Sequence, residues 1–594
     1  MRAASLFVVL ILAKVLTLAG RNASWSFPAS LGYFWQDAAV ALVAAAIDIS
    51  LRRPRIGWAA YALVVGYAAI NVPIARVLSS PLTWPMIHAA RGPLADSIAR
   101  YLDWVSFGAA GLVVAAGVGV SWLLRRQPQA VYAWVMVVAA CVVIAGFRMA
   151  SEYDTVGLDR NAITALVATP ALPRVEASPL RRDWRVSPFA SIAPSVTTGR
   201  EKLVPARDLT QLSGAARGLN VLVVILESTG ARYLKPYGAP DDPMPNLTAL
   251  THDAIVFDNA YAVYPESIKG LFATLCSRYP AFGVSAEQHA DVPCAPIAKI
   301  LGAAGYRTAL FHSGRFRYLG MQEILERQGF DVLEDAGAIG GVVRSSFGVD
   351  EPSTVARILR WIDAQDSRQP FFVAYLPAAG HHPYAIPDSA PVVFPPATDS
   401  GRYRNALHYA DAALGALLAG LKTRGIADRT LVVVFGDHGE AFGQHPGNIG
   451  HSLFLNEENV RVPYAIALPG RIKGELRVHR LASLLDTAPT ILDLTGLPRS
   501  PEHEGLSLLR PGEPMALFHT DYSLGWLGLR DGCWKYLFEI DDGRSKLFDL
   551  CHDPDETADR SGAHTDRVRA YHDRVIAWSA AERDLVLSSY TSRR

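Results

Sequence analysis

Long apolar runs dominate the start of the chain and give way to shorter runs after about residue 147. With its flanks, each long run approaches the ~20 residues that cross a bilayer as an α-helix. The first run could instead be a cleaved signal peptide, because it follows Met1-Arg2, but no small-residue cleavage site follows it. We therefore expect a five-helix transmembrane domain over residues 1–148, with apolar cores at 6–18, 38–51, 58–77, 107–124 and 131–147.

Residues 149–218 are rich in Pro, Ser, Ala and Arg and lack sustained periodicity, which is typical of a linker. From residue 219 onward, short apolar runs alternate with helical patterns. Strands are expected at 220–226, 308–311, 371–375 and 430–435, and a helix at 404–421. This alternation predicts an α/β domain over residues 219–594, with a central, mostly parallel sheet flanked by helices.

The composition supports a membrane protein and names no charged partner. Hydrophobic residues make up 50% of the chain, and the excess lies before about residue 147. The net charge is +1, and no basic stripe is present, so nothing favours nucleic acid as a partner.

Basic residues predict the orientation of the spans. Arg2, the RRPR run at 52–55 and Arg125-Arg126 lie at the N-terminus, in the second connection and in the fourth. Such segments face the cytoplasm. With five spans, the later domain emerges on the opposite side of the inner (plasma) membrane, in the periplasm or outside the cell.

Four cysteines of the later domain agree with this location. Cys276, Cys294, Cys533 and Cys551 allow three connectivities, of which the two sequence-local pairs, Cys276–Cys294 and Cys533–Cys551, are favoured. Disulfides would require an oxidising compartment. Four unpaired buried thiols are the alternative, and Cys141 lies in an apolar run.

Two expected strands are followed directly by metal-ligand side chains. Glu227 ends VLVVILE, and Asp437-His438 follow TLVVVFG. Ligands bind at the carboxyl ends of strands in open α/β sheets, although an isolated carboxylate there is more often a cap. Two carboxylates and an imidazole suit one divalent ion, zinc or manganese rather than calcium.

The stretch YPESIKGLFATLCSRYP at 264–280 offers a nucleophile. Ser267 precedes an apolar helix, where backbone N–H groups and the helix dipole favour an anion. A hydroxyl in this place is usually only an N-cap. A nearby metal would lower its pKa and prepare it to attack phosphorus or sulfur.

This stretch resembles the signature of the arylsulfatases, Cys-x-Pro-Ser-Arg followed by a helix and Gly-Arg-Tyr-Pro, with Ser267 at the nucleophile position. The chain resembles the alkaline phosphatase/sulfatase superfamily, in its membrane-anchored branch of lipoteichoic-acid synthases, phosphoglycerol transferases and phosphoethanolamine transferases. That branch carries threonine in this slot. The Pro and Arg of a formylglycine sulfatase are missing, and Lys269 is the expected substitute for the arginine's charge.

The resemblance implies further site residues. Glu227, Asp437 and His438 match a single-metal ligand set, which Ser267 completes through Oγ. GHHPY resembles the Asn-His-x-Pro-Phe motif of the synthases. The implied catalytic histidines are His381 and His451, and the implied head-group contacts are His312 and Phe347. The synthases carry Trp where Phe347 stands, so the glycerol preference is open.

Residues 481–498 and 546–556 resemble the late helix and terminal hairpin of sulfatases, which implies a small C-terminal antiparallel sub-domain over residues 500–560. We therefore expect metal-dependent transfer of a phosphoglycerol or phosphoethanolamine head group from a membrane lipid to a glycan or lipid acceptor, through a covalent Ser267 intermediate. A membrane-anchored sulfuric- or phosphoric-ester hydrolase is the first alternative. An inactive head-group sensor is a second, and a transporter is disfavoured by the few charges within the spans.

Overall fold

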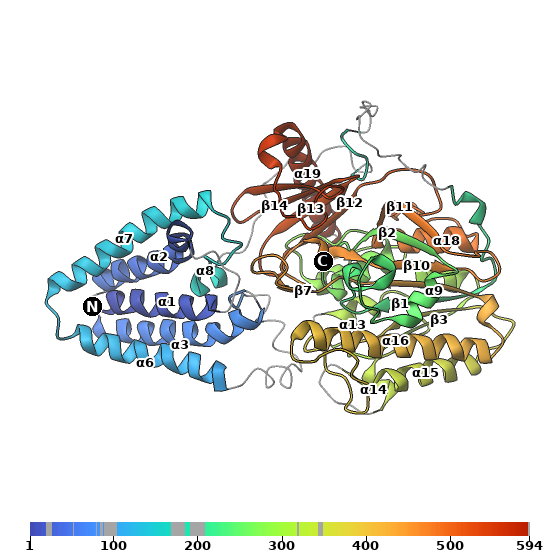
Figure 1. The fold of residues 1–594 in the computed structure, drawn as a ribbon, viewed down its shortest axis with the longest axis horizontal. Helices are drawn as coiled ribbons and strands as arrows, with labels where there is room; N and C mark the ends of the chain where they lie inside the picture. Colours follow the sequence, from blue (N-terminus) through green and yellow to red (C-terminus); the bar gives the residue numbers. More distant parts are fainter. Residues whose placement is uncertain are drawn as a thin grey trace. The chain divides into compact units, whose positions relative to one another are not determined.

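The computed structural model describes residues 1–19, 26–51, 53–78, 80–83, 87, 104–167, 184–189, 208–317, 320–341 and 348–591. The chain forms two compact units (Figure 1). Unit 1 comprises Met1–Pro170 with Ala441–Leu453 and Tyr522–Leu524. Unit 2 comprises Ala171–Glu440, Phe454–Asp521 and Gly525–Arg594.

Unit 1 contains long apolar helices at the places where the hydrophobic runs predict them. They are α1 (Arg2–Leu18), α2 (Phe27–Leu51), α3 (Pro54–Leu78), α6 (Trp104–Leu124) and α7 (Gln129–Glu152). Among the described residues, four helices are long and apolar enough to cross a membrane, namely α2, α3, α6 and α7. Helix α1 has 17 residues and packs against α2, α3 and α6. The length and composition of these four helices therefore indicate a membrane-embedded N-terminal part. That α1 is a fifth span stays a prediction.

Basic side chains gather at one end of the helices of unit 1. The Arg2 Nε atom lies 2.9 Å from Asp48 Oδ2, and a terminal nitrogen of Arg2 donates to the Pro54 carbonyl over 2.8 Å. Both Arg2 and Arg125 stand over the Trp58 ring, at 5.8 and 5.0 Å from its centroid. The N-terminus, the α2–α3 connection and the α6–α7 connection therefore share one end of the bundle.

Unit 2 is built on a nine-stranded sheet of strand order β11-β2-β10-β6-β1-β5-β3-β4, with β9 paired to β2. Strands β6, β1, β5 and β3 are neighbours and run parallel. They are apolar and almost fully buried, as strands covered on both faces must be. The strands are β1 (Asn220–Leu226), β2 (Ile255–Tyr261), β3 (Arg307–His312), β4 (Val332–Glu334), β5 (Phe371–Leu376), β6 (Thr430–Gly436), β9 (Arg461–Val462), β10 (Tyr464–Ala467) and β11 (Leu476–Ser483).

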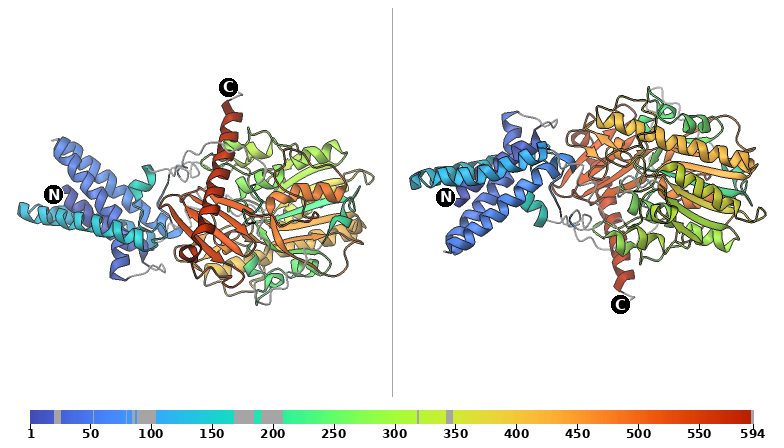
Figure 2. Two further views of the ribbon diagram at one scale, coloured as in Figure 1. Left: turned by 90° about the horizontal axis from the view of Figure 1, so that it is seen from above. Right: turned by 90° about the horizontal axis from the view of Figure 1, so that it is seen from below.

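Helices cover both faces of this sheet (Figures 1 and 2). One layer holds α9 (Pro245–Thr251), α15 (Glu351–Asp363) and α16 (Asp399–Thr423), which pack in a row with α16 in the middle. The other layer holds α10 (Ser267–Cys276), which packs against α12 (Ile297–Ala303) and α18 (Thr487–Thr495). The alternation of strands and helices in the sequence correctly predicts this α/β class.

Most strands of the sheet run in one direction, as predicted, but the sheet is mixed because β10 and the short β9 run antiparallel to their neighbours. Strand β10 lies between β2 and β6 and runs antiparallel to both. A parallel strand needs a crossover that returns the chain to the starting edge. Between β6 and β10 the described elements are the short β7 (Ala441–Phe442), β8 (Ile449–Gly450), α17 (Glu457–Val460) and β9, so no long helix makes that return.

A separate four-stranded antiparallel sheet follows near the C-terminus, in the order β12-β13-β14-β15. Its strands are β12 (Ala516–Thr520), β13 (Trp526–Asp531), β14 (Trp534–Glu539) and β15 (Arg544–Asp549). Helix α19 (Thr565–Thr591) packs along β13, β14 and β15 (Figure 2). The buried side chains of Tyr536, Tyr571 and Trp578 belong to the apolar cluster that joins the sheet and the helix.

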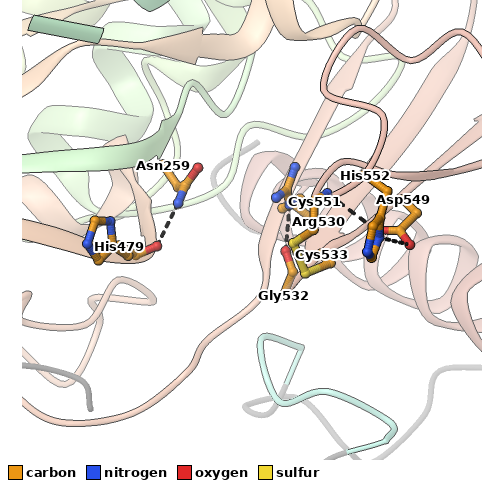
Figure 3. The surroundings of a disulfide bond; sticks show 8 residues. All are labelled: Asn259, His479, Arg530, Gly532, Cys533, Asp549, Cys551 and His552. Atoms are coloured by element: carbon orange, nitrogen blue, oxygen red, sulfur yellow. Dashed lines mark hydrogen bonds and ion pairs between the residues drawn. A yellow bond between two sulfur atoms is a disulfide. The ribbon is translucent and has the colours of Figure 1, made fainter. Parts of the chain in front are cut away.

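Both predicted disulfides are present. Cys276 pairs with Cys294, and Cys533 pairs with Cys551 (Figure 3). Asp549 lies close enough to Cys533 and Cys551 for the three to resemble a metal-ligand group. Because the two sulfurs are bonded to each other, this cluster is a cross-link of the small sheet rather than a metal site.

A buried lysine ties the small sheet to the rest of unit 2. Lys535 on β14 is fully buried, and its Nζ atom lies 3.0 Å from Glu457 Oε1 and 2.8 Å from Glu556 Oε1. Tyr261 at the end of β2 donates to the other oxygen of Glu457 over 3.1 Å. One ammonium group therefore pairs with two carboxylates from different segments.

Replacing Lys535 with methionine should destabilise unit 2 strongly. The substitution keeps most of the volume but removes the ammonium group that two buried carboxylates share, which costs about 3–5 kcal/mol. Chemical denaturation of the solubilised chain measures the loss. The matched control is Lys473→Met at an exposed position, for which we expect a change of less than about 0.5 kcal/mol. Equal stability of the two variants would contradict this account of Lys535.

Candidate active site

The carboxyl ends of four parallel strands bring the predicted site residues to one edge of the sheet. Glu227 follows β1, and Asp437 and His438 follow β6. In the β1–β6 ladder Leu226 is paired with Gly436, so the first residues beyond the two strands are neighbours. His312 is the last residue of β3, and His381 follows β5 after a short loop. These side chains therefore follow the carboxyl ends of neighbouring strands.

Ser267 lies among the three predicted ligands. It is the first residue of α10, whose N-cap residue Glu266 accepts a hydrogen bond from the Ile268 N–H. The Ser267 Oγ atom lies 2.6 Å from Asp437 Oδ2, 2.9 Å from Glu227 Oε2 and 3.4 Å from His438 Nε2. One hydroxyl therefore faces both carboxylates and the imidazole.

The backbone next to Glu227 is shaped to hold this geometry. Ser228 has φ of 53°, in the left-handed region that costs a non-glycine residue free energy. In this conformation its N–H donates to Asp437 Oδ1 over 2.9 Å, and its hydroxyl donates to Glu227 Oε1 over 2.8 Å. Gly380 passes so close that a Cβ atom there would lie 2.1 Å from the Glu227 carbonyl oxygen. A strained residue and a glycine thus fix the first carboxylate.

His438 turns its Nε2 atom, which could bind a metal ion, toward the two carboxylates. Its Nδ1 atom lies 3.0 Å from the Gly439 carbonyl oxygen, which can only accept, so Nδ1 carries the proton. Nε2 is left with its lone pair toward the site, 3.6 Å from Glu227 Oε1 and 3.6 Å from Asp437 Oδ2. A backbone carbonyl that fixes the histidine tautomer in this way is typical of metal-ligating histidines.

The two buried carboxylates make this site suitable for a cation. Burial, together with repulsion from Glu227, raises the pKa of Asp437 to about 7. Burial alone would lower the pKa of His438, but the two carboxylates outweigh it and the pKa is raised. The ligand atoms of Glu227, Asp437 and His438 all lie within 4.8 Å of one another. Two buried carboxylates facing one hydroxyl are a donor set for a divalent metal ion, and these residues fit one.

Lys269 lies one turn into α10 and forms a buried ion pair. Its Nζ atom lies 2.8 and 3.0 Å from the two carboxylate oxygens of Asp521. Asp521 also accepts from the Tyr264 hydroxyl over 2.7 Å and from the Gly283 N–H over 2.6 Å. Burial opposes ionisation of Asp521, yet the charge of Lys269 holds its pKa at about 2. The ammonium group is therefore fixed in place, with its charge shared by Asp521.

Two predicted histidines, His312 and His381, lie at the same edge of the sheet as the residues that could bind a metal ion. His312 is buried, donates from Nδ1 to the Leu376 carbonyl over 3.0 Å and stacks on Phe316. Burial lowers its pKa, against an opposing effect of Glu227, so the ring is neutral near pH 7. His381 Nδ1 donates to the His382 carbonyl over 2.6 Å.

Sequence reasoning missed two buried carboxylates of this region. Glu440, two residues after His438, is fully buried, and the Tyr384 hydroxyl hydrogen-bonds to it. Burial raises its pKa to about 7. Glu351 accepts from the N–H groups of Ala378 and Ala379 over 2.8 and 3.0 Å, in the loop that leads to His381. Glu440 could have been recognised from its place in the GDHGE motif. The role of Glu351 could not, because it depends on tertiary contacts.

Two further residues were predicted for this site. Phe347 falls outside the described residues. His451 directly follows β8, is half-buried and belongs to unit 1. Their roles remain predictions.

The fold and the site define an alkaline phosphatase-like domain. Residues 219–497 match the family model described as sulfatase. The crystal structure of the lipoteichoic acid synthase LtaP from Listeria monocytogenes superposes with a TM-score of 0.51 at 20% identity, over 65% of this chain and 95% of that one. At this identity the similarity shows the fold alone.

Two curated relatives are similar in sequence. Lipoteichoic acid synthase 2 of Bacillus subtilis is 26% identical over 303 residues, covering 48% of this chain and 46% of that protein. Arylsulfatase K of Mus musculus is 33% identical over 165 residues, covering 25% of this chain and 29% of that protein. The chain thus spans less than half the length of either relative.

Behind α10 lies a buried histidine that affects stability. His519 on β12 is 1% exposed and packs against the rings of Tyr264, Phe282 and Trp578. Burial lowers its pKa to about 3 from an ordinary value of 6.5. As the pH falls, the unfolded chain therefore takes up a proton before the folded one does. The stability that neutral His519 contributes is complete above pH 6.5 and is lost as the pH falls toward 3.

Replacing His519 with phenylalanine should flatten the dependence of stability on pH. Between pH 7 and pH 5 the wild-type chain should lose about 2 kcal/mol through this residue, and the variant should not. Unfolding of the solubilised chain at the two pH values measures the difference. His252→Phe at an exposed histidine is the control and should keep the wild-type slope. An unchanged slope in His519→Phe would show that this residue does not titrate as described.

Proposed function

We propose that the protein transfers a phospho-head group, phosphoglycerol or phosphoethanolamine, from a membrane lipid to a glycan or lipid acceptor through a covalent intermediate on Ser267. The observation that carries the proposal is the placement of Ser267. Its Oγ atom lies at the start of a helix, 2.6 and 2.9 Å from two buried carboxylates and 3.4 Å from His438 Nε2. Similarity to lipoteichoic acid synthase 2 supports the choice of a lipid head group.

In the first step Ser267 Oγ attacks the phosphorus of the lipid donor. The hydroxyl proton passes to a carboxylate oxygen, and Asp437 Oδ2 at 2.6 Å is the nearer acceptor. A bond forms between Oγ and phosphorus, and the bond from phosphorus to the diacylglycerol oxygen breaks. The leaving oxygen takes a proton from a histidine, for which we assign His381 or His451. Ser267 then carries the head group as a phosphodiester.

In the second step a hydroxyl of the acceptor attacks the same phosphorus. The acceptor loses its proton to the histidine that protonated the leaving group, and the Ser267 oxygen recovers a proton as the bond to phosphorus breaks. Backbone N–H groups at the start of α10 point toward the phosphoryl oxygens. Lys269, ion-paired with Asp521, offers its N–H groups on the same helix, and we assign the head-group contacts to His312 and Phe347.

One divalent cation, zinc or manganese rather than calcium, would be held by Glu227, Asp437, His438 and Ser267 and would lower the pKa of the serine hydroxyl. The mixed oxygen and nitrogen donors support this preference. The raised pKa of Asp437 supports a positive charge at this place.

The anchor delivers the domain to its lipid donor. We assign residues 1–148 to a five-span anchor with α1 as the first span, residues 149–218 to a linker, and residues 219–594 to the catalytic domain. Arg2 and Arg125 share one end of the helices, which supports a cytoplasmic location for that end. The disulfides support a periplasmic or extracellular location for the catalytic domain and therefore insertion in the inner (plasma) membrane.

A second candidate function is hydrolysis of sulfate or phosphate esters with water as the acceptor. The similarity to arylsulfatase K favours it, since that match has the higher identity of the two curated relatives. The same Ser267 nucleophile would serve both reactions, so the acceptor distinguishes them.

Intact mass spectrometry of the metal-loaded protein tests the proposal. We expect the wild-type chain to gain the mass of one head group after incubation with vesicles of phosphatidylglycerol or phosphatidylethanolamine, and Ser267→Ala to gain none. Ser285→Ala replaces an exposed serine that precedes another short helix and should form the adduct normally.

Full turnover by Ser267→Ala would contradict the covalent scheme. A wild-type protein that forms no adduct with either lipid, yet cleaves sulfate or phosphate monoesters, would replace the transferase by the hydrolase. An adduct with only one of the two lipids names the donor.

A further inference from the structure

A cavity of about 780 Å³ lies in unit 2 and shares no residue with the site at Ser267. It lies between β11, α18, the loop over residues 497–514 and the segment that holds Arg185. Ser277, at the far end of α10, donates to the Leu485 carbonyl over 2.8 Å and accepts from Gly505 N–H over 3.1 Å. The cavity is therefore near the C-terminal end of α10, about 15 Å along the helix from Ser267.

Four arginines line this cavity, and three of them have evident partners. Arg185 forms a two-pronged ion pair with the buried Asp486, and Arg510 forms one with Asp493. Arg499 is exposed to solvent and donates to the Gly505 carbonyl over 3.1 Å. The charges of these three are thus neutralised or hydrated.

Arg480 on β11 differs from these three arginines in its partners. Its side chain is only 8% exposed, and its terminal nitrogens donate to the backbone carbonyls of Leu508 and Arg510. Its Nε–H is buried and has no acceptor among the described residues, and no carboxylate of that part of the chain forms an ion pair with it. A buried guanidinium held only by neutral carbonyls keeps its full positive charge.

The surroundings of Arg480 do not compensate this charge. Burial lowers the pKa of the Arg480 guanidinium, and the opposing effects of Asp486 and Glu513 are not sufficient to restore it. Asp486 is already bound by Arg185. Buried charges in proteins are paired as a rule, because removal from water is costly. An anion in the cavity would provide the missing partner.

The rest of the cavity lining indicates what kind of molecule would fit beside the anionic group. It is largely apolar, with Val186, Pro489, Leu497, Leu508, Pro511 and Pro514, and it also includes the side chains of Glu504 and Glu513. A volume of about 780 Å³ is in the range of sites that enclose organic molecules rather than single ions. An oxyanion with an apolar body would use both the guanidinium and this lining.

We propose that this cavity binds an organic anion, with a carboxylate, sulfate or phosphate group against Arg480 and an apolar body against the prolines and leucines of the 497–514 loop. This site is separate from the chemistry at Ser267 and does not depend on the proposed function. Occupancy would also stiffen the loop, because Arg480 holds the carbonyls of Leu508 and Arg510.

Hydrogen–deuterium exchange of the full chain in a neutral detergent tests the proposal. The probes are hexyl sulfate, hexyl phosphate and hexanoate, with hexanol and inorganic sulfate as controls. We expect the three organic anions to slow exchange in peptides that cover residues 476–514, hexanol to leave it unchanged, and inorganic sulfate to need at least about tenfold higher concentration. Localisation to these peptides separates the cavity from the Ser267 site.

Two variants decide the role of the residues. Arg480→Gln should raise the organic-anion concentration that is needed for protection from exchange at least about tenfold. Arg429→Gln, at an exposed arginine, should leave that concentration as in the wild type. Val186→Trp adds bulk at a lining position that is 53% exposed, so it should block binding without disturbing the fold. No protection in the wild type, equal protection in Arg480→Gln and Val186→Trp, or equal protection by hexanol would overturn the proposal. Equal potency of inorganic sulfate would overturn the organic part of it.

Discussion

Two buried carboxylates that face one serine hydroxyl are the constraint on which this domain depends. Asp437 and Glu227 approach the Ser267 oxygen at 2.6 and 2.9 Å, and each raises the cost of ionising the other. Such an arrangement is unfavourable unless a cation or a proton joins it. The fold nevertheless holds it with a left-handed Ser228 and with a glycine, Gly380, packed against the Glu227 backbone. Strain kept at this place is understandable if it serves a metal-activated nucleophile.

The parallel strands explain how residues far apart in the sequence meet. Strands β6, β1, β5 and β3 are neighbours, and their carboxyl ends point to the same edge. Each strand delivers one or two polar groups there. The loops beyond the strands are held by a further buried carboxylate, since Glu351 accepts the N–H groups of Ala378 and Ala379 in the loop before His381. The rigid framework is apolar, and the polar groups lie where it ends.

The sequence was informative where a pattern is local. The run NVLVVIL is buried along almost its whole length, so β1 was predicted with its observed bounds, and Glu227 follows it directly. Strand β2 was missed, because IVFDNAY mixes polar residues into its second half. The antiparallel β10 was missed as well, because its direction depends on the path of the chain after β6.

Tertiary pairing explains the other differences. Lys269 was expected to substitute for the charge of the sulfatase arginine, and the structure pairs it with Asp521, which lies 252 residues later and could not be recognised from sequence. The same holds for Arg480, whose lack of a counter-ion is visible only when the neighbouring loop is in place. The disulfides were predictable because both pairs are local, with the partners 18 positions apart in the sequence.

Anomalous diffraction from crystals of the metal-loaded protein, recorded above and below the absorption edges of zinc and manganese, tests the central claim most directly. The account predicts one peak in unit 2, at about 2.0–2.3 Å from oxygen atoms of Glu227 and Asp437, His438 Nε2 and Ser267 Oγ. A peak that lies away from these four residues, or the absence of any peak in crystals of the active metal-loaded enzyme, would contradict it.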